Sequence, residues 1–299
     1  MKQLLKRLTS ACLCLLCPAV YAAEVTDDAG RLITLEEPAA RIISLAPSLT
    51  ELVFAAGAGA RLVGVIAYSD YPEAALSIPR VGRYDMLDME RILALEPDLV
   101  LAWQSGNPRS TVSRLRELGL TVYLAEPKSL ESIPTHLERI GILAGTESSA
   151  TRAIATFNSE LRALRQEFGN EAPIDTFYQI WNEPLITAGG NELINDIIRE
   201  CGGVNVFGDI RQVAPKVSTE AVLARSPEVI VASGIDRERP DWLDDWRRWP
   251  ALPAAARDNL FSIPPALLQR HTPRVLEGTR AMCEHLASAR LRRSDSAEP

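Results

Sequence analysis

Continuous apolar runs alternate with helical patterns in the first half of the chain. Four short, mostly apolar runs are typical of strands that a parallel sheet buries on both faces: 41–45, 62–66, 99–102 and 121–124. Apolar residues at helical spacing predict helices over 48–56 and 110–118. In the first helix, Ser48 is expected to be the N-cap, with Glu51 completing a capping box. Regular alternation of this kind predicts parallel β-structure with right-handed crossovers.

One pattern occurs twice, 130 residues apart. Residues 89–102 and 219–232 share a glutamate, a Leu-Ala pair, a proline and an acidic residue in the same register, so Glu90 corresponds to Glu220. Each copy predicts a short helix that stops before proline, followed by a buried strand. Because a solenoid needs more copies at a shorter period, two copies predict two α/β lobes of similar design.

A long helix is predicted between these lobes. Residues 147–168 contain no proline or glycine and repeat apolar residues at helical spacing, which predicts a helix about 33 Å long. A flexible hinge would be shorter and richer in glycine or serine, so we expect a rigid spacer with a ligand site in the cleft between two Rossmann-like lobes. The predicted organisation is a signal segment, an N-terminal lobe, the spacer, a C-terminal lobe and a disordered tail: 1–22, 23–145, 146–169, 170–291 and 292–299.

The first residues have the pattern of a cleaved secretory signal. Lys2, Lys6 and Arg7 precede a short apolar run, and Val20-Tyr21-Ala22 offers a cleavage site. That run is shorter than the roughly 20 residues of a membrane-spanning helix. A lipidated N-terminus is the alternative, disfavoured because Leu16, not a small residue, precedes Cys17. We therefore predict that the chain is exported and that this segment is removed.

Removal of the signal segment would leave two of the five cysteines in the exported chain. Without the signal segment, Cys201 and Cys283 remain, and two cysteines in an exported chain most simply form a disulfide. Two free buried thiols are the alternative.

Composition excludes several kinds of function. The formal charge of −7 and the isoelectric point of about 5.2 argue against nucleic-acid binding. The three histidines, His136, His271 and His285, are too scattered for a multi-histidine metal site. The sequence contains no G-x-S-x-G, complete G-x-G-x-x-G, Walker A lysine or H-E-x-x-H motif, so it offers little support for an enzyme.

Aromatic residues follow several predicted strands. Tyr68, Tyr71 and Tyr84 lie in predicted loops, Trp103 directly follows the strand 99–102, and Trp181 follows a strand in the second lobe. Open α/β sheets hold ligands beyond the carboxyl ends of their strands, and flat rings there suit a large, partly apolar ligand. The alternative is that these rings only cap the lobe cores.

Glu90 and Glu220 allow two interpretations. Each lies near a predicted helix start, where the helix dipole stabilises a carboxylate. Their symmetric placement, one on each lobe, also suits two basic pockets of a partner protein, because charge pairs favour correct orientation.

Several segments of the chain resemble the periplasmic cobalamin-binding proteins of vitamin uptake transporters, a class III binding-protein family. The matching segments run in order through nearly the whole mature chain: 45–51 (LAPSLTE), 68–72 (YSDYP), 88–92 (DMERI), 96–103 (EPDLVLAW), 201–203 (CGG) and 217–220 (VSTE). The resemblance implies two α/β lobes joined by one long helix, with the corrinoid in the cleft. It also implies that Glu90 and Glu220 meet arginines of the permease of an ABC importer, and it supports a Cys201–Cys283 disulfide.

The resemblance further implies that Tyr68, Tyr84 and Trp103 flank the ligand. The predicted ligand-binding set is Ser48, Tyr68, Tyr84, Trp103, Trp181 and Arg270. Arg270 matches a ligand-side arginine of the family, although Leu267-Leu268 replaces a more aromatic stretch there. Ala214 stands where a covering tryptophan is found, and Trp181 is expected to compensate. Axial contact from His271 with the cobalt is left open.

The prediction is a monomeric, non-catalytic periplasmic receptor for cobalamin, with no cofactor or metal site of its own and no affinity for nucleic acid. A haem or iron–siderophore receptor of the same architecture is one alternative. An exported hydrolase acting on a bulky substrate is another, from a different class. The shortage of histidine argues against zinc.

Overall fold

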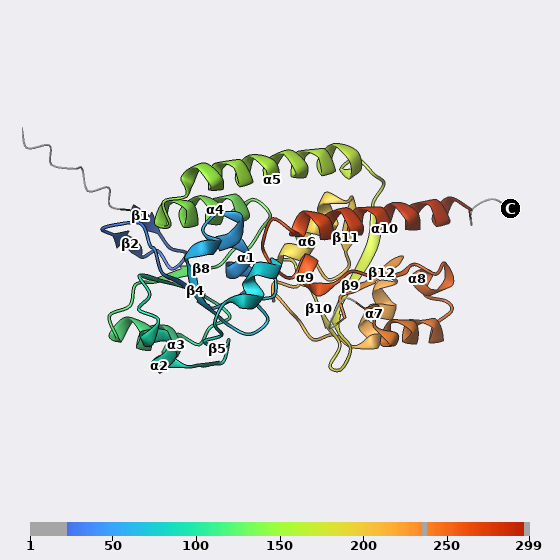
Figure 1. Cartoon of the computed structure of the whole chain (residues 1–299). Coiled ribbons are helices and arrows are strands. Elements are labelled where there is room, and N and C mark those ends of the chain that lie inside the picture. The colour runs from blue at the N-terminus through green and yellow to red at the C-terminus, as the bar shows by residue number, and fades with distance from the viewer. Residues whose placement is uncertain (1–22, 235–237, 296–299) are drawn as a thin grey trace, which may run out of the picture.

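Two α/β lobes lie side by side in the computed structural model, which describes residues 23–234 and 238–295 (Figure 1). Helix α5 (Glu147–Phe168) runs along one side of the molecule and reaches from one lobe to the other. The predicted signal segment lies outside the described residues. Within those residues, no helix combines the length and the apolar character needed to span a membrane.

The first lobe is built on a parallel four-stranded sheet in the order β4-β3-β7-β8. Its strands coincide with the four apolar runs: β3 (Ile42–Ser44), β4 (Leu62–Val65), β7 (Leu99–Trp103) and β8 (Val122–Ala125). Its helices are α1 (Pro47–Ala55), α2 (Met89–Ala94), α3 (Arg109–Glu117) and α4 (Ser132–Leu143). Apolar side chains on both faces of the sheet are buried in two separate clusters, which explains why the strands lack alternation.

The second lobe carries a five-stranded sheet, in which β9 pairs with β10, β11 and β12, and β12 pairs with β13. Its strands are β9 (Ile174–Trp181), β10 (Ile186–Thr187), β11 (Gly203–Asn205), β12 (Val229–Ala232) and β13 (Leu260–Ser262). Its helices are α6 (Leu193–Glu200), α7 (Thr219–Arg225), α8 (Pro253–Ala256), α9 (Pro265–Leu268) and α10 (Val275–Asp295), with a 3₁₀ segment η3 (Asp241–Arg248). Only β10 is antiparallel to its neighbour. The predicted fold class, two parallel-sheet lobes joined by a long helix, is confirmed.

The sequence repeat is a structural repeat. Asp88 caps α2 by accepting a hydrogen bond from Arg91 N at 2.9 Å, and Ser218 caps α7 by accepting one from Ala221 N at 3.2 Å. Each helix leads into a buried parallel strand of its own lobe. The same helix–strand unit therefore occupies equivalent places in the two sheets.

The predicted capping box at the start of α1 is wrong. The helix begins at Pro47, with Ala46 as its N-cap, and no side chain caps it. Proline suits the first helical turn because its missing N–H has no acceptor there. Ser48 is thus inside the helix, and the Glu51 side chain is available for partners in the other lobe.

Two antiparallel hairpins were not predicted, because their strands are too short to show alternation. One, β1 (Ala23–Thr26) with β2 (Leu32–Leu35), precedes the first sheet, and the other, β5 (Gly82–Arg83) with β6 (Met86–Leu87), precedes α2. Short 3₁₀ turns η1 (Gly59–Arg61) and η2 (Glu73–Ser77) complete the first lobe.

Two features hold α5 and the C-terminal helix in place. Helix α5 buries Phe157, Leu161, Leu164 and Phe168 against the lobes. The predicted Cys201–Cys283 disulfide is confirmed and links the end of α6 to α10.

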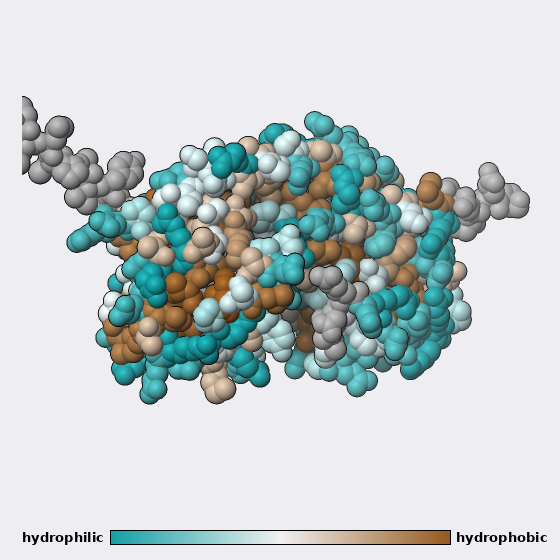
Figure 2. All heavy atoms as spheres, viewed as in Figure 1, coloured by the Kyte–Doolittle hydropathy of each residue, from teal (hydrophilic) through white to brown (hydrophobic). Residues whose placement is uncertain are grey.

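Surface side chains on the second lobe are mainly hydrophilic on the face that Figure 2 shows, whereas apolar side chains gather on the first lobe.

The predicted start of the C-terminal tail lies inside α10, which continues to Asp295. Arg293 pairs with Glu228 and donates a hydrogen bond to Pro173 O at 3.0 Å, and Arg292 donates to Asp258 O at 2.5 Å. These contacts with the body of the second lobe explain why the helix extends beyond the predicted boundary at 291. The last four residues lie outside the described part.

Candidate ligand-binding cleft

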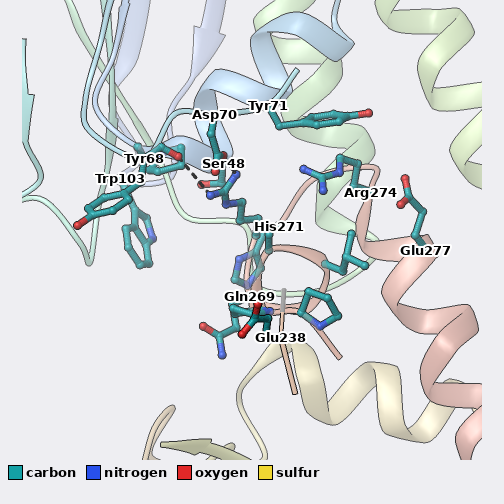
Figure 3. Close-up of a pocket in the computed structure, with 17 residues that line it drawn as sticks. Ser48, Tyr68, Asp70, Tyr71, Trp103, Glu238, Gln269, His271, Arg274 and Glu277 are labelled. Carbon is teal, nitrogen blue, oxygen red and sulfur yellow. Dashed lines mark hydrogen bonds and ion pairs between the residues drawn. The ribbon is translucent and has the colours of Figure 1, made fainter. Parts of the chain in front are cut away.

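A cleft of about 1310 Å³ lies between the two lobes. Its described lining comes from both of them: Ala46, Pro47, Ser48, Tyr68, Asp70, Tyr71 and Trp103 in the first lobe, and Glu238, Pro264, Pro265, Ala266, Leu267, Gln269, Arg270, His271, Arg274 and Glu277 in the second (Figure 3). These segments follow the carboxyl ends of β3, β4, β7, β12 and β13. The site thus lies where parallel α/β sheets hold their ligands, as the sequence predicts.

Two aromatic rings form the first-lobe wall. Tyr68 is 75% exposed and Trp103 is 39% exposed, so neither ring serves as a cap on a lobe core. The Trp103 indole packs against Gly106, where a Cβ atom would lie only 1.9 Å from the indole Cε3. Asn107 fixes the end of this strand, because its Oδ1 accepts from Trp103 N at 2.7 Å and its Nδ2 donates to Leu45 O at 3.1 Å.

Two predicted ligand contacts, Tyr84 and Trp181, are not among the described residues that line the cleft. Tyr84 lies in the turn of the β5–β6 hairpin and is exposed. Trp181 ends β9, and its indole N–H donates to Glu183 O at 3.0 Å within the turn toward β10. Among the described residues, the second lobe therefore supplies prolines, Leu267 and His271 to the cleft instead of the expected covering ring.

Arg270 lines the cleft, but its guanidinium binds the first lobe. Nη1 donates to Glu51 Oε1 at 2.9 Å and to Asp70 Oδ1 at 2.6 Å, and Nη2 donates to Tyr68 O at 3.2 Å. Burial alone would lower the pKa of Arg270, but the two carboxylates outweigh it and raise that pKa. Arg270 is therefore a charged link between the lobes that also holds the loop carrying Tyr68.

Glu51 is the centre of this link. It is only 4% exposed, and its carboxylate also accepts hydrogen bonds from Thr272 Oγ1 at 2.9 Å and Arg274 Nη1 at 3.1 Å. The Arg274 guanidinium lies 3.7 Å from the centroid of the Tyr71 ring, a cation–π contact between the lobes. The sequence pattern does not predict this role, although Glu51 is the single charged residue between 45 and 60.

His271 lies on the second-lobe wall beside a buried carboxyl group. Its side chain is 18% exposed, and its Nε2 lies 4.0 Å from Glu192 Oε1. Burial lowers the pKa of His271 to about 4 and raises the pKa of Glu192 to about 7. The imidazole is therefore neutral at pH 7. Within the described ranges, no group of three or more His, Cys, Asp or Glu side chains could hold a metal ion.

Glu90 and Glu220 lie outside the cleft lining. Each is an exposed residue in the first turn of its helix, α2 in the first lobe and α7 in the second. Both helices lie on the side of the molecule opposite to α5 (Figure 1). The structure therefore places the two helices that carry these glutamates, one from each lobe, on the same side of the molecule.

Comparisons with known proteins identify the family. The pattern of the family described as periplasmic binding protein matches residues 42–267. The vitamin B12-binding protein of Vibrio cholerae serotype O1 is 38% identical over 253 residues, which is 84% of this chain and 91% of the relative. That of Yersinia pestis is 36% identical over 258 residues, 86% of this chain and 90% of the relative.

Solved structures agree with this assignment. The crystal structure of the periplasmic vitamin B12 binding protein BtuF of Vibrio cholerae matches with a TM-score of 0.77 and 37% identity, over 85% of this chain and 98% of that one. The periplasmic heme-binding protein RhuT from Roseiflexus matches with a TM-score of 0.73, over 83% and 98% of the two chains, but at 24% identity it shows the fold alone. The chain belongs to the periplasmic binding protein family and is a binding protein, not an enzyme.

Proposed function

We propose that this protein captures cobalamin, or a related corrinoid, in the cleft between its lobes and delivers it to a membrane ABC transporter. The observation that carries the proposal is the exposed aromatic wall of Tyr68 and Trp103 on a cleft of about 1310 Å³. Two relatives at 36–38% identity over most of the chain are vitamin B12-binding proteins. The hydrolase alternative is not supported, because the chain is a binding protein.

The dimensions and chemistry of the cleft suit a large, partly apolar ligand. Sites for drug-sized molecules enclose about 300–1,000 Å³, so this cleft has room for a macrocycle. Flat rings can cover a macrocycle while losing little conformational entropy. The charged groups Asp70 and Arg270 already pair with each other, so neither of them requires a charged partner on the ligand.

Delivery to the transporter is assigned to Glu90 and Glu220. Both residues are exposed and lie in equivalent helices of the two lobes, and these helices lie on one side of the molecule. This arrangement supports contact with two basic pockets of a permease. Such contacts would orient the two proteins more than they would add affinity.

Parallel titration of the purified mature protein with cyanocobalamin, haem and ferric siderophores tests the ligand assignment. Calorimetry should show one cyanocobalamin bound per chain, and the ligand should be recovered chemically unchanged. A chain that binds haem or a siderophore and ignores cyanocobalamin would contradict the proposal and favour the related receptors of the same fold.

Replacing Trp103 with alanine should weaken cyanocobalamin binding by about 1–3 kcal/mol, because a large aromatic contact with the ligand is lost. The measurement is calorimetric titration of the two proteins at the same pH. Trp181→Ala is the matched control, since Trp181 is equally exposed but does not line the cleft. Equal affinities of the Trp103→Ala variant and the unchanged protein would remove Trp103 from the site.

A further inference from the structure

His271 projects from the second-lobe wall of the cleft, whereas Tyr68 and Trp103 belong to the first-lobe wall (Figure 3). A flat macrocycle held between these walls turns one face toward each lobe. The metal ion of a corrinoid lies at the centre of the ring, with its axial positions above and below the plane. A side chain that projects from one wall can therefore reach an axial position.

The imidazole has the chemistry for such a contact. Nitrogen ligands of this type suit cobalt and iron, whereas carboxylates favour harder ions. Among the described cleft residues, Asp70 is engaged by Arg270, and Glu238 and Glu277 are exposed. A neutral imidazole carries a lone pair on one ring nitrogen, and that nitrogen can bind a metal ion.

The second-lobe wall holds this ring beside the cleft. The His271 side chain is 18% exposed, and its chain neighbours Gln269 and Arg270 also line the cleft.

We propose that His271 supplies an axial ligand, through a ring nitrogen, to the cobalt of a bound corrinoid whose axial position holds an exchangeable water. The inference rests on the proposed function and adds a specificity to it. In the exchange, the cobalt–water bond breaks and a cobalt–nitrogen bond forms. One neutral lone-pair donor replaces another, so the oxidation state of the cobalt is unchanged, and a neutral imidazole that donates its lone pair releases no proton.

Aquacobalamin and cyanocobalamin separate this contact from binding in general, because cyanide holds its axial position and water exchanges. Visible absorption and calorimetry are recorded together for each complex. Bound aquacobalamin should acquire the spectrum of free aquacobalamin with added imidazole, whereas the cyanocobalamin spectrum should not change. His271→Ala should lose that spectral change, and it should weaken binding of aquacobalamin about tenfold more than it weakens binding of cyanocobalamin.

His285→Ala is the matched control, because His285 is not among the described residues that line the cleft. Its ring stacks on that of Phe261 instead, with 4.4 Å between the ring centroids. This variant should behave like the unchanged protein with both ligands. Aquacobalamin that binds with an unaltered spectrum would overturn the axial contact and leave the proposed function standing, as would a spectral change retained by His271→Ala. A chain that binds neither corrinoid would overturn both.

Discussion

Replacing Glu51 with alanine is expected to lower the free energy of unfolding by about 3–5 kcal/mol, the usual cost of removing one partner from a buried ion pair. The substitution leaves the guanidinium groups of Arg270 and Arg274 without their common carboxylate, and both side chains are largely buried. Thr272 Oγ1 also loses its acceptor. Urea denaturation followed by circular dichroism measures the change.

Two further variants sharpen the result. Glu51→Gln keeps the volume and an oxygen acceptor, so it should cost less than Glu51→Ala. Glu117→Ala removes an exposed carboxylate from a surface pair with Arg114 and should cost no more than about 1 kcal/mol. A Glu51→Ala variant as stable as Glu117→Ala would show that the charged link contributes nothing to holding the lobes together.

The same link connects stability to ligand binding. Arg270 holds both the Asp70 carboxylate and the Tyr68 carbonyl, and Tyr68 has a left-handed backbone with φ of 65°. A non-glycine residue persists in that conformation only where its surroundings enforce it. The aromatic wall of the first lobe is thus kept in place partly by a residue of the second lobe.

Local patterns were enough to predict most of the fold. Continuous apolar runs identify strands buried on both faces, and the apolar spacing over 147–168 gives the bounds of α5 to the residue. The rule that ligands lie beyond the carboxyl ends of parallel strands led to Tyr68 and Trp103, and both line the cleft.

Partners that are distant in sequence could not be predicted in this way. Ser48 and Glu51 have the spacing of a capping box, but the carboxylate of Glu51 binds residues more than 200 positions away. Tyr84 lies in a loop and Trp181 at the end of a strand, as predicted. Each belongs to a short hairpin, however, and neither is among the described residues that line the cleft. Such orientations depend on tertiary packing, which a local pattern does not contain.

Reversing the charge of both Glu90 and Glu220 to arginine should abolish uptake of cobalamin while leaving its binding unchanged. Both side chains are exposed and neither lines the cleft, so the ligand site is untouched. A positive charge in a first helical turn costs only about 0.3–1 kcal/mol per site, so the variant should fold. Against basic pockets of a permease, however, two arginines would replace attraction by repulsion at both lobes at once.

The measurement pairs calorimetric affinity with transport of labelled cobalamin into vesicles that contain the importer. Glu147→Arg is the matched control, because Glu147 is also an exposed residue in a first helical turn but belongs to α5, on the opposite side of the molecule (Figure 1). It should transport normally, and each single reversal should retain part of the activity, since one lobe can still dock. Normal transport by the double variant would reduce both glutamates to residues that stabilise helix starts, and the docking surface would have to be sought elsewhere on the two lobes.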